Sequence, residues 1–91
     1  MTSQETFGIA AFRSRQQVMR FDRALRRAGI RSDIVSTPRD VAVGCGLSVQ
    51  FDLKDLRAVQ NVYRQMPSGN LIGFYQVAYV PGQRPLIAPL R

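Results

Sequence analysis

A chain of 91 residues with 45% hydrophobic and 21% charged residues has the size and composition of one small globular domain. It contains no His and a single Cys, Cys45, which excludes His-dependent catalytic pairs, an ordinary zinc site and a disulfide within the chain. We therefore expect no metal and no cofactor. The net charge of +7 would attract nucleic acid, an anionic membrane or an acidic protein. No apolar run reaches membrane-spanning length and no leader pattern is visible, so we expect a cytoplasmic protein.

The first predicted elements are a strand and a helix. Residues 7–12 form a short apolar run typical of a buried strand. Ser14 followed by Gln17 predicts a capping box, and apolar residues at helical spacing extend a helix over 15–28. Gly29 predicts the end of this helix, because glycine readily adopts the left-handed conformation that follows a helix.

This helix and its flanks are strongly basic. Residues 13–31 contain seven Arg and one acid, Asp22. Such a surface fits an acidic protein partner, and a solvated helix face that keeps the protein soluble explains it equally well. The residues predicted to bind a partner are Arg13, Arg15, Arg20, Arg23 and Arg27.

The middle of the chain predicts two more strands and a second helix. Residues 30–37 form a strand that ends at Pro38, because proline cannot donate to a strand ladder. Residues 47–51 alternate between apolar and polar, which is typical of a strand buried on one face. Asp52 is the predicted N-cap of a helix. The apolar face of that helix consists of Leu56, Val59, Tyr63 and Met66.

A turn at 67–70 and a strand at 71–79 complete a predicted domain over 1–79, and residues 80–91 form a Pro-containing basic tail, expected to be a loose arm. The order of elements predicts an α+β, ferredoxin-like βαββαβ sandwich. Its four-stranded antiparallel sheet has the order 4-1-3-2, with two helices on one face. The other face needs small or polar residues or a partner, which leaves a homodimer or another protein partner open.

The connection at 37–46 is longer than a hairpin requires, and such loops often carry function. Cys45 lies there between Gly44 and Gly46, which permit unusual backbone dihedrals and leave the sulfur accessible.

The predicted topology brings this loop to the same end of the sheet as the start of the first helix. Arg13, Arg15, Arg39 and Arg64 would then surround the thiol of Cys45, and their charge would lower its pKa. A buried, unreactive Cys that fills space explains the residue equally well.

The pairs Pro38-Arg39 and Cys45-Gly46 resemble the signature of small bacterial domains of unknown function described as selenium/sulfur carrier-like. The resemblance covers about residues 7–79. Other matching positions are Phe12, Ser14, Asp22, Ala28, Gly29 and Ile30. The Arg-rich first helix and the basic tail depart from the pattern.

The resemblance implies a carrier or accessory protein rather than a stand-alone enzyme. Cys45 would hold sulfur or selenium as a persulfide, receive it from a cysteine desulfurase and pass it to an acceptor enzyme. Arg39 and the amide of Gly46 would stabilise the anionic persulfide. The complete set of supporting residues is Arg39, Pro38, Gly44, Gly46 and Ser14.

Two other functions remain open. The protein could be an adaptor that binds an acidic partner through its basic helix, with Cys45 purely structural. It could also bind nucleic acid through phosphate contacts, although its first and third strands lack the aromatic run of RNA-recognition motifs, which argues against this function.

Overall fold

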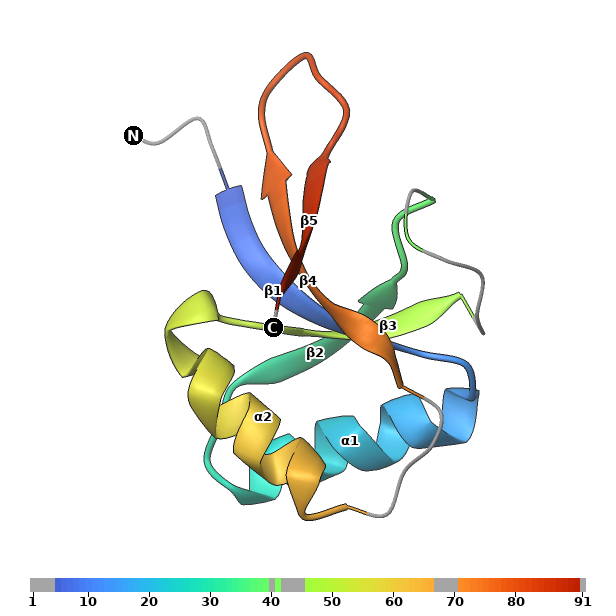
Figure 1. Cartoon of the computed structure of the whole chain (residues 1–91), viewed down its shortest axis with the longest axis vertical. Helices are drawn as coiled ribbons and strands as arrows, with labels where there is room; N and C mark the ends of the chain where they lie inside the picture. Colours follow the sequence, from blue (N-terminus) through green and yellow to red (C-terminus); the bar gives the residue numbers. More distant parts are fainter. Residues whose placement is uncertain (1–4, 40, 42–45, 67–70, 91) are drawn as a thin grey trace.

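The computed structural model describes residues 5–39, 41, 46–66 and 71–90. The predictions for Gly44, Cys45 and the turn at 67–70 lie outside these ranges. The elements are β1 (Glu5–Phe12), α1 (Arg15–Arg27), β2 (Ser32–Ser36), β3 (Leu47–Phe51), a 3₁₀ turn η1 (Leu53–Asp55), α2 (Leu56–Arg64), β4 (Leu71–Tyr79) and β5 (Leu86–Leu90). Both helices lie on the same side of the sheet (Figure 1). None of the helices in the described part of the chain is long and apolar enough to cross a membrane.

The sheet has five strands in the order β2-β3-β1-β4-β5, and all neighbouring strands are antiparallel. The first four strands have the predicted order, which confirms the α+β architecture, but the prediction of a four-stranded sheet is wrong. The expected loose arm supplies β5, which pairs Leu86 with Ala78 and Leu90 with Phe74. Pro89 within β5 is tolerated because an edge strand needs hydrogen bonds along one side only.

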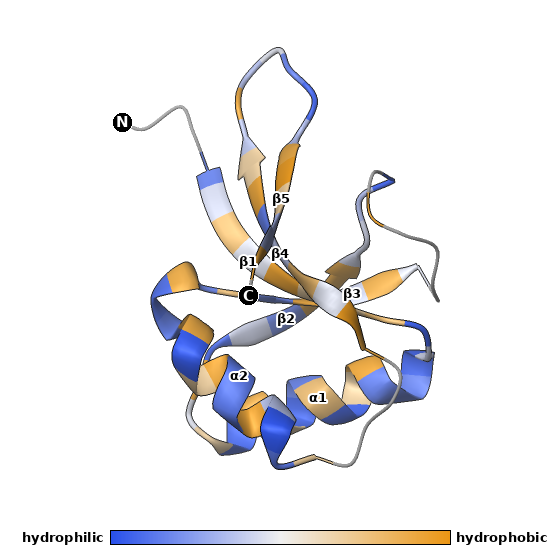
Figure 2. Cartoon of the chain, in the orientation of Figure 1, coloured by the Kyte–Doolittle hydropathy of each residue, from blue (hydrophilic) through white to orange (hydrophobic). Residues whose placement is uncertain are grey.

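The main core lies between the sheet and the helices. Phe12 from β1, Phe21 and Leu25 from α1, and Val59 from α2 are almost completely buried there. The rings of Phe12 and Phe21 have centroids 5.3 Å apart and tilted planes, a favourable arrangement for aromatic pairs. Hydrophobic and hydrophilic residues alternate along both helices, because each helix buries one stripe against the sheet (Figure 2).

The C-terminal end of α1 agrees with the prediction, whereas its N-terminal end does not. Gly29 has a φ of 79°, and the amides of Gly29 and Ile30 donate to the carbonyls of Arg26 and Leu25, as expected for a glycine-terminated helix. At the other end, the carbonyl of Ser14 accepts the amide of Val18, but the Ser14 side chain makes no capping hydrogen bond. The predicted capping box is therefore not formed.

Asp52 also caps differently from the prediction. Its carboxylate accepts the amide of Lys54 at 3.3 Å and so caps η1, whereas α2 begins only at Leu56.

A second, smaller core covers the sheet face opposite the helices. Ile9 and Ala11 of β1 and Val77 of β4 are buried there, together with Val41 from the connection between β2 and β3. The sequence predicted that this face needs small or polar residues or a partner. In the structure, Val41, which is only 7% exposed, provides part of the cover from within the chain. A homodimer through this face stays a prediction.

The core predicts a large difference between two substitutions in the same helix. Phe21→Ala removes a fully buried ring and should lower the free energy of unfolding by about 3–5 kcal/mol. Met19→Ala truncates a side chain that is 50% exposed and should cost less than about 1 kcal/mol. Urea denaturation monitored by circular dichroism measures both changes, and equal losses would contradict the described packing.

Candidate functional site

The connection between β2 and β3 is closed at its base by two hydrogen bonds. The amide of Thr37 donates to the carbonyl of Gly46 at 2.9 Å, one position beyond the last strand pair. The hydroxyls of Thr37 and Ser48 are 2.6 Å apart, and Ser48 is fully buried. Thr37 and Gly46, which flank the segment that contains Cys45, are therefore held together at the end of the sheet.

The first half of this segment folds onto the sheet. The amide of Val41 donates to the carbonyl of Pro38 at 3.0 Å, which forms a turn, and the Val41 side chain enters the second core. Arg39 lies in this turn with its side chain exposed. Arg39 lies between Thr37, which pairs with Gly46, and Val41, which is buried in the second core. These two contacts set the position of Arg39 relative to the sheet.

Gly46 confirms one expectation about the backbone near Cys45. Its φ of 84° lies in the left-handed region that glycine adopts without strain. Another residue at this position would be strained even though no neighbour lies within 4 Å of the place its Cβ would take. Cys45 and Gly44 lie outside the described residues, so the accessibility of the thiol stays a prediction.

Arg39 lines a cavity of about 400 Å³ that the sequence did not predict. Its wall consists of Pro38, Arg39, Tyr79, Arg84 and Pro85. Arg84 comes from the connection between β4 and β5, a region interpreted from the sequence as a loose arm. No local pattern around Arg84 indicates a site, because only strand pairing brings this connection back to the sheet.

The cavity also corrects the predicted grouping of arginines. Tyr79 pairs with Glu5 at the start of β1, whereas Arg13 follows the end of this strand. An extended strand of eight residues spans roughly 25 Å. The structure therefore places Arg39 at a cavity with Arg84 and away from Arg13 and Arg15, because the turn at Pro38 carries Arg39 back over the sheet. Cys45 lies outside the described residues, so the position of Arg13, Arg15 and Arg64 around its thiol stays a prediction.

A second cavity, of about 290 Å³, adjoins the first and shares Pro38 and Tyr79 with it. Its other lining residues are Glu5, Phe7, Ile9, Val35, Ser36 and Gln50. The ring centroids of Phe7 and Tyr79 are 5.7 Å apart, so this wall is largely aromatic and aliphatic. The described residues contain no group of three or more His, Cys, Asp or Glu side chains that could hold a metal ion.

The arginines predicted to bind a partner are all exposed. These are Arg13, Arg15, Arg20, Arg23 and Arg27. Arg20, Arg23 and Arg27 are spaced by three and four residues, which places them on one stripe of α1. Within the described ranges, both ion pairs are made by Arg26, so these five guanidinium groups have no carboxylate partner there.

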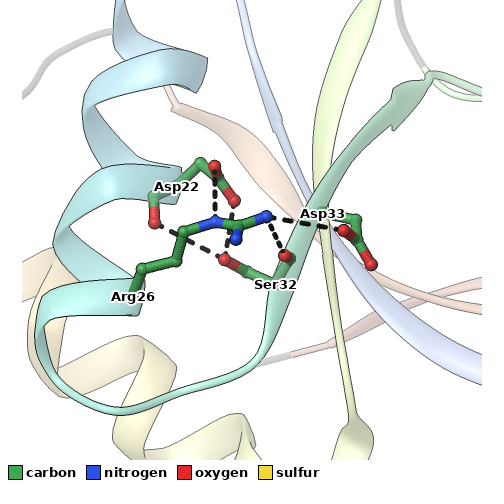
Figure 3. Close-up of polar contacts among 4 residues, drawn as sticks. All are labelled: Asp22, Arg26, Ser32 and Asp33. Atoms are coloured by element: carbon green, nitrogen blue, oxygen red, sulfur yellow. Dashed lines mark hydrogen bonds and ion pairs between the residues drawn. The ribbon is translucent and has the colours of Figure 1, made fainter.

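Arg26 has a structural role instead, in a polar cluster that joins α1 to β2 (Figure 3). Its Nε donates to Asp22 Oδ2 at 3.1 Å, and its Nη2 donates to the carbonyl of Ser32 at 2.7 Å and to Asp33 Oδ1 at 3.5 Å. The buried Ser32 hydroxyl donates to Asp22 Oδ1 at 2.6 Å. Asp22 thus accepts from both elements, which gives the one acid of the basic segment a structural explanation.

Loss of Asp22 should therefore destabilise the domain. Asp22→Ala removes the carboxylate that accepts from the buried Ser32 hydroxyl at 2.6 Å and leaves only the backbone carbonyl of residue 22, at 3.4 Å, so it should lower the free energy of unfolding by about 1–3 kcal/mol. The control Asp33→Ala removes a carboxylate that is 69% exposed and only 3.5 Å from Arg26, and should change stability by less than about 0.5 kcal/mol. Chemical denaturation of both variants measures this, and a neutral Asp22→Ala would show that the cluster contributes little.

Comparison with known proteins identifies the family. The family model described as "Putative Se/S carrier protein-like" matches residues 7–68, which is more than half of the chain. The chain therefore belongs to this family, and the suspected resemblance is confirmed. The match runs from β1 to the end of α2 and contains the connection with Cys45. No curated protein and no solved structure matches the chain significantly.

Proposed function

We propose that this protein carries sulfur or selenium on Cys45 and delivers it to an acceptor enzyme. The observation that carries the proposal is the position of the one thiol of the chain inside the match to the Se/S carrier-like family. The described ends of the connection that contains Cys45 support it: Thr37 and Gly46 pair at its base, and Gly46 has a backbone conformation suited to glycine.

The chemistry requires no cofactor and no external oxidant. The Cys45 thiolate attacks the outer sulfur of a persulfide on a donor enzyme, the donor's S–S bond breaks, and the donor cysteine leaves as a thiolate. Cys45 then holds the persulfide. In the second step a nucleophile of the acceptor attacks the outer sulfur, and Cys45 leaves as a thiolate. Sulfur is transferred with no net oxidation or reduction, and a terminal selenium atom would follow the same path.

The predicted supporting residues have distinct roles in this proposal. The Arg39 guanidinium and the amide of Gly46 would stabilise the anionic persulfide, and Gly44 would keep the loop open to a partner's active site. Pro38 holds the turn that positions Arg39, since its carbonyl accepts the amide of Val41. Ser14 starts α1 through its carbonyl.

Donor and acceptor enzymes would dock through acidic surfaces on the basic stripe of α1. The guanidinium groups of Arg20, Arg23 and Arg27 are exposed and make no ion pair with the described carboxylates, and such surface cations accelerate association with an acidic partner. The exchange belongs in a reducing compartment such as the cytoplasm, where thiols are kept free.

Sulfur loading is directly measurable. Incubation of the purified protein with a cysteine desulfurase and cysteine should produce a species heavier by one or more sulfur atoms in intact-mass spectra. Added thiol should remove it, because a thiol attacks the outer sulfur.

The variant Cys45→Ser should never form the heavier species, because a hydroxyl does not accept sulfane sulfur under these conditions. Absence of the species from the wild-type protein would refute the carrier function. A Cys45→Ala strain that keeps the physiological function would instead favour the adaptor, with Cys45 structural.

The basic stripe makes a separate prediction about rate. Arg23→Glu should slow sulfur transfer from the desulfurase several-fold at low salt, and added salt should slow transfer to the wild type, because screening weakens steering between opposite charges. The control Arg57→Glu makes the same charge change at an exposed position of α2 and should have a smaller effect. Equal effects of the two substitutions would show that net charge, and not the α1 stripe, matters.

A further inference from the structure

The carrier proposal assigns no function to the cavity between Arg39 and Arg84. This cavity is lined by two arginines and Tyr79, which come from the connection after β2 and from the end of β4 and the following turn. Its volume of about 400 Å³ lies within the range of small-molecule sites.

Both arginines are carried by anchored turns. Arg39 follows Pro38, whose carbonyl accepts the amide of Val41, and Val41 is buried in the second core. On the opposite wall, the amide of Gln83 donates to the carbonyl of Val80 at 3.0 Å. Gly82 in this second turn has a φ of 78°, and Pro85 restricts the backbone directly after Arg84. Little backbone ordering is therefore required before a ligand binds.

The charge of this cavity is uncompensated in the described part of the chain. Both ion pairs found there belong to Arg26, and neither Arg39 nor Arg84 contacts a carboxylate among these residues. Among the described acids, Glu5 lines the adjoining cavity and not this one. Two like charges on one cavity repel each other, and a bound anion would offset that repulsion.

The donors identify the class of anion. A guanidinium group presents a planar fork of N–H donors that matches two oxygens of a phosphate or carboxylate. Arg39 and Arg84 come from two different segments of the wall, and two such forks suit the several oxygens of a tetrahedral oxyanion better than the two oxygens of a planar carboxylate. Tyr79, which is 43% exposed, adds a third polar side chain to the lining.

We propose that Arg39, Arg84 and Tyr79 form a binding site for a small tetrahedral oxyanion of the phosphate or sulfate type. The site uses no described residue of the basic stripe on α1. It shares Arg39 with the proposed carrier function, but oxyanion binding requires no sulfur on Cys45.

The test is a titration of the full-length Cys45→Ser protein with inorganic phosphate at constant ionic strength, followed by amide NMR. This background removes thiol chemistry, so the result is independent of sulfur loading. We expect saturable shifts at Arg39, Tyr79 and Arg84, with a parallel sulfate titration giving shifts at the same residues. Chloride at the same ionic strength should give none.

Substitutions then distinguish the site from general attraction to a basic protein. Arg84→Gln and Arg39→Gln should each weaken phosphate binding at least ten-fold, because each removes one charged fork. Arg84→Lys, which keeps the charge but loses the fork, should weaken it less. The control Arg57→Gln removes one exposed charge on α2 and should leave binding unchanged. Non-saturating shifts, or an equal loss in Arg57→Gln, would overturn the proposal.

Discussion

The constraint on which the rest of the structure depends is the burial of β1 on both of its faces. This central strand pairs with β3 on one side and β4 on the other. Ala10 and Phe12 face the helices, whereas Ile9 and Ala11 face the opposite side, and all four are at most 1% exposed. A strand buried in this way requires cover on both sides of the sheet, because water must be excluded from each apolar surface. Two helices supply one cover, and Val41 contributes to the other.

This requirement links the core to the candidate site. Val41 reaches the second core only because the connection after β2 turns back at Pro38, and the same turn carries Arg39 to the cavity with Arg84. The base of the connection is held by Thr37, whose amide and hydroxyl bond on the β3 side. Pro38, Arg39 and Gly46, the described residues of the family-matching pairs, thus belong to a connection that the sheet and the second core hold in place. The turn at Pro38 and the burial of Val41 therefore contribute both to the second core and to the position of Arg39.

Most of the architecture could be predicted from local patterns. Strands β3 and β4 have the predicted bounds, and α1 ends at Arg27, two residues before Gly29, whose positive φ terminates the helix as predicted. The failures have local causes as well. Pro85 and Pro89 indicated a loop, yet an edge strand tolerates proline, so β5 was missed. The Ser14 side chain does not cap, because a capping box depends on a rotamer that sequence spacing does not determine.

The sequence by itself determined the chemical inventory: one thiol, no His, an excess of Arg, and the signature pairs that place Cys45 in a Se/S carrier-like family. Only the tertiary structure decided which arginines line the same cavity. Arg39 and Arg84 are 45 positions apart in the numbering, and the pairing of β4 with β5 together with burial of Val41 brings them to one cavity. Arg26, one of seven similar residues in its segment, is distinguished only by its contacts with Asp22 and Ser32. Residue type is a local property, whereas the partner of a charge depends on contacts that folding creates between distant segments.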